Sequence, residues 1–166
     1  MVNLRRIVRH VGITPWYLRR AFPPRALTAI TAAIERSESK HVGQIRFAVE
    51  GALHGARLIH DQSPRERAVE VFSNLRMWDT EHRNGVLIYL LLADRAVEIV
   101  ADRGAHIRVG SQEWQRVCEQ IQETLRNRHY QSAIEEGIDA VTQHLARHFP
   151  AVRSPSKQLP DSPVLL

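Results

Sequence analysis

The chain has 166 residues and a mass of 19.0 kDa, with 43% hydrophobic and 25% charged residues and no internal repeat. This is the composition of one ordinary globular domain that is long enough to bury a substantial core. The single cysteine, Cys118, excludes an intramolecular disulfide and a thiolate zinc cluster. It also fits a reducing compartment, so we expect a cytoplasmic protein, either free or peripheral to the membrane.

The net charge of +5 is unevenly distributed along the chain. Residues 1–34 contain six arginines, no lysine and no acidic residue, so this segment carries +6 and the rest of the chain carries −1. Because the chain after residue 34 is nearly neutral, it is not expected to bind nucleic acid. Any electrostatic attraction to a partner is expected to come from the N-terminal segment.

The basic N-terminal arm, residues 1–24, is predicted to begin with a short amphipathic helix. Its apolar face comprises Leu4, Ile7, Val8 and Val11. Two interpretations remain open: the arm contacts an anionic membrane surface or a protein partner, or Trp16 and Phe22 pack on the domain while the arginines are solvated. The contact residues under the first interpretation are Arg5, Arg6, Arg9, Trp16, Arg19 and Arg20. The arm lacks the apolar core and cleavage site of a secretory signal, and without serines it fits a transit peptide less well than a cytoplasmic protein.

The domain, residues 25–150, is predicted to start with a helix after Pro23-Pro24, followed by a strand. Alternating residues at Ile45, Phe47 and Val49 predict that strand, which ends near Gly51. Residues 52–62 are predicted to form a loop. The sequence Ser63-Pro64-Arg65-Glu66 is a capping box with proline at the first helical position, which predicts the start of a second helix.

The longest apolar run, Val86 to Leu92, predicts a central strand that is covered on both faces. Val97 to Ile99 alternate as a second strand, and Ala93, Asp94 and Arg95 between the strands fit only a tight reversal, so the two should pair as an antiparallel hairpin. A transmembrane helix is disfavoured because Asp94, Arg95 and Glu98 interrupt the run. With the upstream strand and helix, the hairpin completes a right-handed βαβ unit.

Two further helices and a tail complete the prediction. Ser111 is expected to cap a third helix with Trp114 and Cys118 on its apolar face, and a fourth helix should end near Phe149. The Pro/Ser-rich tail, residues 151–166, lacks periodicity and is predicted to be disordered. The fold class is therefore α/β: an α/β/α sandwich on a small mixed sheet with helices on both faces.

The sequence Arg83-Asn84-Gly85-Val86-Leu87, placed before a hairpin that ends Ile99-Val100-Ala101-Asp102-Arg103-Gly104, resembles the TPM domain family. That family is named after a thylakoid-lumen protein, a photosystem II repair protein and a receptor-accessory protein. The resemblance covers roughly residues 27–149 and is strongest to a small soluble bacterial branch. It implies an α/β/α sandwich, and for some members acid phosphatase activity and divalent-cation binding, with calcium or magnesium as the ion. Here Arg83 stands where many relatives carry an acid.

A candidate metal or phosphate site arises where the predicted loops meet at one sheet edge. The entry to the central strand and the end of its antiparallel partner share that edge, and oxygen and imidazole groups there can hold a divalent ion. The residues concerned are Asp79, His82, Asn84, Asp102 and His106. The alternative is structural: the same side chains cap turns and help the chain enter the strand.

No nucleophile elbow, Gly-rich phosphate loop or phosphatase signature is present in the sequence. We therefore expect a TPM-like, non-catalytic binding or accessory module for a protein partner or a membrane surface. The alternative function is a weak divalent-metal-dependent acid phosphatase that uses Asp79, His82, Asn84 and Asp102.

Overall fold

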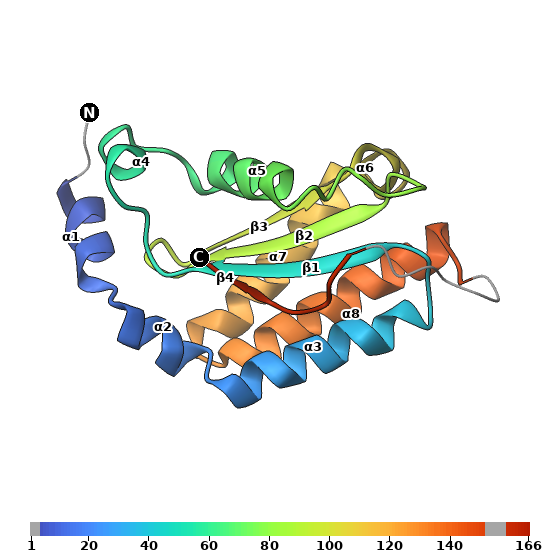
Figure 1. Cartoon of the computed structure of the whole chain (residues 1–166), viewed down its shortest axis with the longest axis horizontal. Helices are drawn as coiled ribbons and strands as arrows, with labels where there is room; N and C mark the ends of the chain where they lie inside the picture. The colour runs from blue at the N-terminus through green and yellow to red at the C-terminus, as the bar shows by residue number, and fades with distance from the viewer. Residues whose placement is uncertain (1–3, 152–158) are drawn as a thin grey trace.

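The computed structural model describes residues 4–151 and 159–166, and a mixed four-stranded sheet with helices on both faces forms its centre (Figure 1). The strand order is β3-β2-β1-β4. The strands are β1 (Gln44–Glu50), β2 (Gly85–Leu91), β3 (Ala96–Ala101) and β4 (Val164–Leu165). The helices of the described ranges are α1 (Leu4–Gly12), α2 (Pro15–Ala21), α3 (Pro24–Glu38), α4 (Ala56–Ile59), α5 (Pro64–Asn74), α6 (Arg103–Val109), α7 (Ser111–Arg126) and α8 (Tyr130–His148). The predicted α/β/α sandwich is confirmed.

The predicted βαβ unit is formed by β1, α5 and β2. The two strands are parallel, in a register that runs from Gln44 opposite Gly85 to Glu50 opposite Leu91. The capping box at the start of α5 is complete, because the Ser63 N–H donates to Glu66 Oε2 at 2.8 Å and the Glu66 N–H donates to Ser63 Oγ at 3.2 Å.

The predicted hairpin is also present, since β2 and β3 pair antiparallel along their whole length. The reversal between them is tight: the Arg95 N–H donates to the Leu92 carbonyl at 3.1 Å, and Arg95 itself has a φ of 52°. Every residue of β2 is buried, as expected of a central strand with both faces covered.

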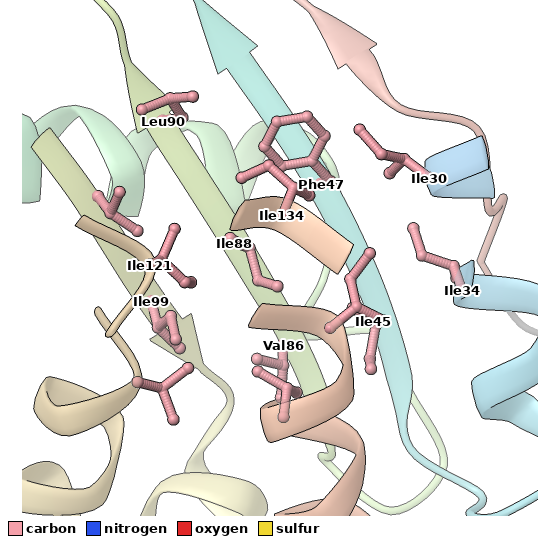
Figure 2. Close-up of a cluster of buried hydrophobic side chains, with 14 of the residues drawn as sticks. Ile30, Ile34, Ile45, Phe47, Val86, Ile88, Leu90, Ile99, Ile121 and Ile134 are labelled. Carbon is pink, nitrogen blue, oxygen red and sulfur yellow. The ribbon is translucent and has the colours of Figure 1, made fainter. Parts of the chain in front are cut away.

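The two faces of the sheet belong to two separate hydrophobic clusters. On the face covered by α3, α7 and α8, isoleucines from all three helices form one cluster with Val86, Ile88 and Leu90 of β2 and with Ile45 and Phe47 of β1 (Figure 2). On the other face, α5 and the segment after it cover the alternate residues of β2. The period of two along β2 therefore divides one continuous apolar run between two cores.

Three short helices occur where the sequence analysis predicts none: α2, α4 and α6. Each is seven residues or fewer, too short to generate a full apolar stripe, and for that reason periodicity did not reveal them. Asp102 caps α6 by accepting the Arg103 N–H at 2.7 Å. The prediction that Ser111 caps the third helix is wrong, because Ser111 is the first residue of α7 and Gly110, with φ at 92°, occupies the cap position.

The tail differs from its prediction where the structure describes it. Residues 152–158 lie outside the described residues, whereas Val164–Leu165 form β4 and pair with β1 in parallel. The Leu166 N–H adds a hydrogen bond to the Val49 carbonyl at 2.9 Å. An edge strand with free carbonyl and N–H groups readily accepts a short apolar segment, which accounts for this pairing.

Candidate functional site

The N-terminal arm is docked on the end of the sheet at which β1 and β2 finish (Figure 1). The contacts run from α1 to two segments there, the loop that follows β1 and the turn of the β2–β3 hairpin. A nine-residue helix is marginal on its own in water, so these contacts fix where α1 lies.

Asp94, in the hairpin turn, is the central acceptor of this docking. Arg6 donates to Asp94 Oδ2 from Nε at 2.9 Å and from Nη2 at 2.7 Å. The same guanidinium reaches Asp61 Oδ1 at 2.5 Å and the Gln62 carbonyl at 2.7 Å. The Arg6 and Asp94 side chains are each only 9% exposed, so this is a buried, multiply hydrogen-bonded ion pair.

His10 completes the docking from the next turn of α1. Its Nδ1 accepts the Leu53 N–H at 2.8 Å, which places the ring hydrogen on Nε2, 3.1 Å from Asp94 Oδ1. Arg9 donates to the same oxygen at 3.0 Å from the surface. The imidazole is fully buried, and its two nitrogens pair with the Leu53 N–H and with Asp94, so both polar atoms of the buried ring are satisfied.

The surroundings of Asp94 hold its carboxyl in the charged form. Burial favours the neutral acid, but the hydrogen bonds from Arg6 and His10, together with the positive charge of Arg6, outweigh it and lower the pKa of Asp94 below its usual range. A lowered carboxyl pKa stabilises the docked state above the usual Asp range, and that contribution disappears as the pH falls through the lowered value.

A second buried ionic network supports the loop on which Arg6 docks. Arg67 of α5 donates to Glu50 Oε2 at 2.8 Å, and the Tyr89 hydroxyl donates to the same oxygen at 2.7 Å. Glu70 contacts Arg67 at 3.0 Å and accepts from Gln62 at 3.1 Å. Hydrogen bonds from Arg57 and Gln62 lower the pKa of Glu70 to about 2. Through Gln62, the two networks are continuous from α1 to the centre of the sheet.

Docking through polar side chains leaves most of the apolar face of α1 in solvent, with Ile7 partly buried. Leu4, Val8 and Val11 are 73%, 66% and 73% exposed, and they are spaced four and three residues apart. Trp16, at the start of α2, is 64% exposed. A surface helix of a globular domain ordinarily buries its apolar stripe and exposes its charges, so α1 has the opposite orientation.

Of the residues predicted to make membrane or partner contacts, all but one are exposed. Arg5, Arg9, Arg19 and Arg20 are exposed beside the apolar residues, and the Arg20 guanidinium lies 5.3 Å from the centre of the Trp16 ring. Arg6 is instead buried. The alternative interpretation is also met only in part, because Phe22 packs in the core at 2% exposure while Trp16 does not.

The predicted metal-site segments do meet at the opposite end of β2. The Asp102 N–H donates to the Gly85 carbonyl at 2.8 Å, and the Ala105 N–H donates to the Arg83 carbonyl at 3.2 Å. Asp79 and His82 are exposed on this loop. Asn84 is buried, and its side-chain amide donates to the Val42 carbonyl at 3.3 Å, which is a structural role.

Two of the predicted ligands have other surroundings. Asp102 uses Oδ1 as the α6 cap, while its Oδ2 is buried without a hydrogen-bond partner in the described part of the chain. His106 lines a cavity of about 410 Å³ beside Glu98 and Cys118. Among residues 4–151 and 159–166, no group of three or more His, Cys, Asp or Glu side chains is placed to hold a metal ion. The predicted cation site therefore stays a prediction.

Cys118 is half-buried on α7, and burial raises the pKa of its thiol to about 11. A thiol in that state is a poor nucleophile near neutral pH, which agrees with its prediction as a packing residue.

No helix in the described ranges is long and apolar enough to cross a bilayer.

The protein is an α/β/α domain with a mixed sheet and a docked basic N-terminal arm. Comparison with known proteins identifies its family. Residues 20–144 match the TPM domain, and the chain belongs to that family. Its structure is similar to the NMR structure of the BA42 protein from the psychrophilic bacterium Bizionia argentinensis, with a TM-score of 0.73, 28% identity, and coverage of 85% of this chain and 92% of that one. It shares the fold of the N-terminal domain of a protein from P. gingivalis, with a TM-score of 0.62, 16% identity, and coverage of 86% and 84%. A search of curated proteins finds no match.

Replacing Asp94 with Asn tests the docking of the arm. Loss of one charge from a buried ion pair costs as much as about 3–5 kcal/mol, so the amides of α1 should exchange their hydrogens at least about tenfold faster. Hydrogen exchange of the full chain measures this, with Asp139→Asn on the exposed side of α8 as the matched control. In the unmodified chain, α1 should stay protected at pH 5 and lose protection only below about pH 4. Unchanged exchange in Asp94→Asn would contradict the docking.

Titration of the isotope-labelled chain with calcium or magnesium tests the predicted cation site. A site made by the predicted residues requires saturable amide shifts in residues 79–85 and 102–106, and these should disappear in Asp102→Asn, which keeps the helix cap but removes the charge. Asp139→Asn again serves as the control. If the amides of both segments stay unmoved up to millimolar ion, the site and the phosphatase hypothesis that depends on it are wrong.

Proposed function

We propose that this TPM domain is a non-catalytic module that binds the surface of an anionic membrane, on its cytoplasmic side, through the exposed face of α1 and α2. The observation that carries this proposal is the orientation of α1, which holds Leu4, Val8 and Val11 outward while its polar residues hold it on the domain. The arm is thus a fixed part of the molecular surface.

The apolar residues of this face are accompanied by exposed arginines, which anionic lipid headgroups attract. Arg5, Arg9, Arg19 and Arg20 are exposed on the same two helices, and the first 34 residues contain no acid. Each basic side chain near an anionic bilayer contributes about 1 kcal/mol of attraction, and the attraction decreases with salt. Trp16, stacked with Arg20, has the amphipathic ring that prefers the membrane interface.

Insertion of the apolar stripe supplies the second part of the binding free energy. Burying one valine side chain contributes about 1.5 kcal/mol or more, so a helix that inserts Leu4, Val8 and Val11 adds several kcal/mol to the electrostatic attraction. A protein partner would need acidic groups around an apolar groove to match this face. Exposed arginines beside an apolar stripe are matched more simply by phosphate headgroups above acyl chains.

The proposal predicts that the full chain binds vesicles of phosphatidylcholine and phosphatidylglycerol but not phosphatidylcholine alone, and that 0.5 M salt weakens the binding. The double substitution Val8→Ser and Val11→Ser should weaken binding at least about tenfold. Ile107→Ser on α6 is the matched control, because Ile107 is equally exposed at 69% but lies outside the arm. Vesicle co-sedimentation measures both.

Equal binding by the double variant would show that the apolar face does not contact lipid. Absence of binding to anionic vesicles by the full chain would contradict the membrane proposal and leave a protein partner as the occupant of this face.

A further inference from the structure

A basic pocket of about 610 Å³ lies between α2, the start of α3 and the start of α8. Its lining includes the guanidinium-bearing residues Arg20, Arg25 and Arg128, together with Tyr17 and Tyr130, and no Asp or Glu. In the described part of the chain, none of these three arginines forms an ion pair with a carboxylate. Three exposed positive charges therefore share one cavity without a compensating acid.

The backbone around this pocket adds to the same positive potential. The 15-residue α3 and the 19-residue α8 both begin at the pocket, neither has a side-chain cap, and neither has an acid in its first turn. Helix N-termini carry partial positive charge and favour acidic side chains, so Arg25 in the first turn of α3 and Arg128 just before α8 are electrostatically unfavourable there. An anion in the pocket would relieve all of these repulsions at once.

Two tyrosine hydroxyls supply neutral hydrogen-bonding groups at the same place. The Tyr17 and Tyr130 oxygens are 2.8 Å apart, and since only one hydrogen is needed between them, the other is free to be donated to a ligand. Burial and the hydrogen bond with Tyr17 raise the pKa of Tyr130 to about 12, so the Tyr130 hydroxyl keeps its hydrogen near pH 7.

A second cavity, of about 440 Å³, shares Tyr17, Arg128 and Tyr130 with the basic pocket. Its lining combines Leu90, Leu92 and Leu125 with further arginines and again contains no acid. It lies beyond the carboxyl end of β2, the region of open α/β sheets in which ligands commonly bind. An organic group attached to an anion in the basic pocket therefore has adjoining apolar surface.

We propose that the basic pocket binds the phosphate group of a phosphate monoester, with Arg128 as the principal contact and the ester's organic part toward the second cavity. Arginine forks match phosphate oxygens in pairs, and a doubly charged monoester neutralises three guanidinium groups better than a singly charged diester. The phosphate group can belong to a small soluble ester or to a lipid headgroup. This site is independent of the apolar face of α1.

The test uses the isotope-labelled full chain at pH 7.5 and constant ionic strength, titrated with inorganic phosphate and with phenyl phosphate against a sodium chloride reference. Saturable shifts should concentrate at residues 20–26 and 128–132, and phenyl phosphate should bind more tightly than inorganic phosphate. Arg128→Gln should weaken binding about tenfold or more, as expected for loss of a charged hydrogen bond. Arg116→Gln, an exposed arginine on α7 outside the pocket, should not.

Two further experiments show whether the phosphate belongs to a soluble ester or to a lipid headgroup. Binding of phenyl phosphate without any preference for vesicles with phosphatidic acid over phosphatidylglycerol identifies a soluble ester. Such a preference, abolished by Arg128→Gln, identifies the lipid headgroup. Val8→Ser with Val11→Ser should leave phosphate binding unchanged, so failure of the membrane proposal leaves this one standing. Absence of saturable shifts, or equal binding by Arg128→Gln and Arg116→Gln, would overturn the phosphate site.

Discussion

The ion pair between Arg6 and Asp94 determines the orientation of α1 on the domain, and with it which side chains of α1 are exposed. Because the guanidinium is buried against the hairpin turn and held by three acceptor groups, α1 can dock only with its polar side inward. The apolar side then faces solvent as a direct consequence. The His10 ring makes the arrangement specific, since its two nitrogens bridge Leu53 and Asp94 across the same interface. The first helix of the arm thus joins the domain through polar side chains, and Leu4, Val8 and Val11 stay exposed.

Much of the central fold follows from the sequence because its signals are local. The capping box at Ser63 sets the start of α5, and the unbroken apolar run of β2 can be satisfied only by a strand covered on both faces. The four residues between β2 and β3 are too few for anything but a hairpin. The short helices and β4 escaped prediction because their stability comes from tertiary contacts. The pairing of Val164 with Ala48, for example, has no counterpart in the local pattern of the tail.

The functional surface was less predictable for a related reason. The sequence identifies the arginines and apolar residues of the arm, but it does not reveal which of six similar arginines finds a buried acid 88 positions away. Asp94 was recognised only as a turn residue, and the Glu50–Arg67–Tyr89 network gave no signal because its members lie on three separate elements. Likewise, Arg20, Arg25 and Arg128 share a cavity only after α2, α3 and α8 have packed. The charge pattern of the sequence indicates which segment is basic. Which arginines come together, and which are buried, can be seen only in the folded structure.

Quenching of tryptophan fluorescence by brominated acyl chains in anionic vesicles measures whether α1 and α2 contact the bilayer. If α1 and α2 rest on the bilayer as described, the unmodified chain is quenched, Trp78→Phe keeps the quenching, and Trp16→Phe loses it. Trp78 is similarly exposed but precedes β2, at the end of that strand opposite Asp94, and so provides the internal reference. Quenching that survives in Trp16→Phe, or none in the unmodified chain, would contradict the orientation of the domain on the membrane.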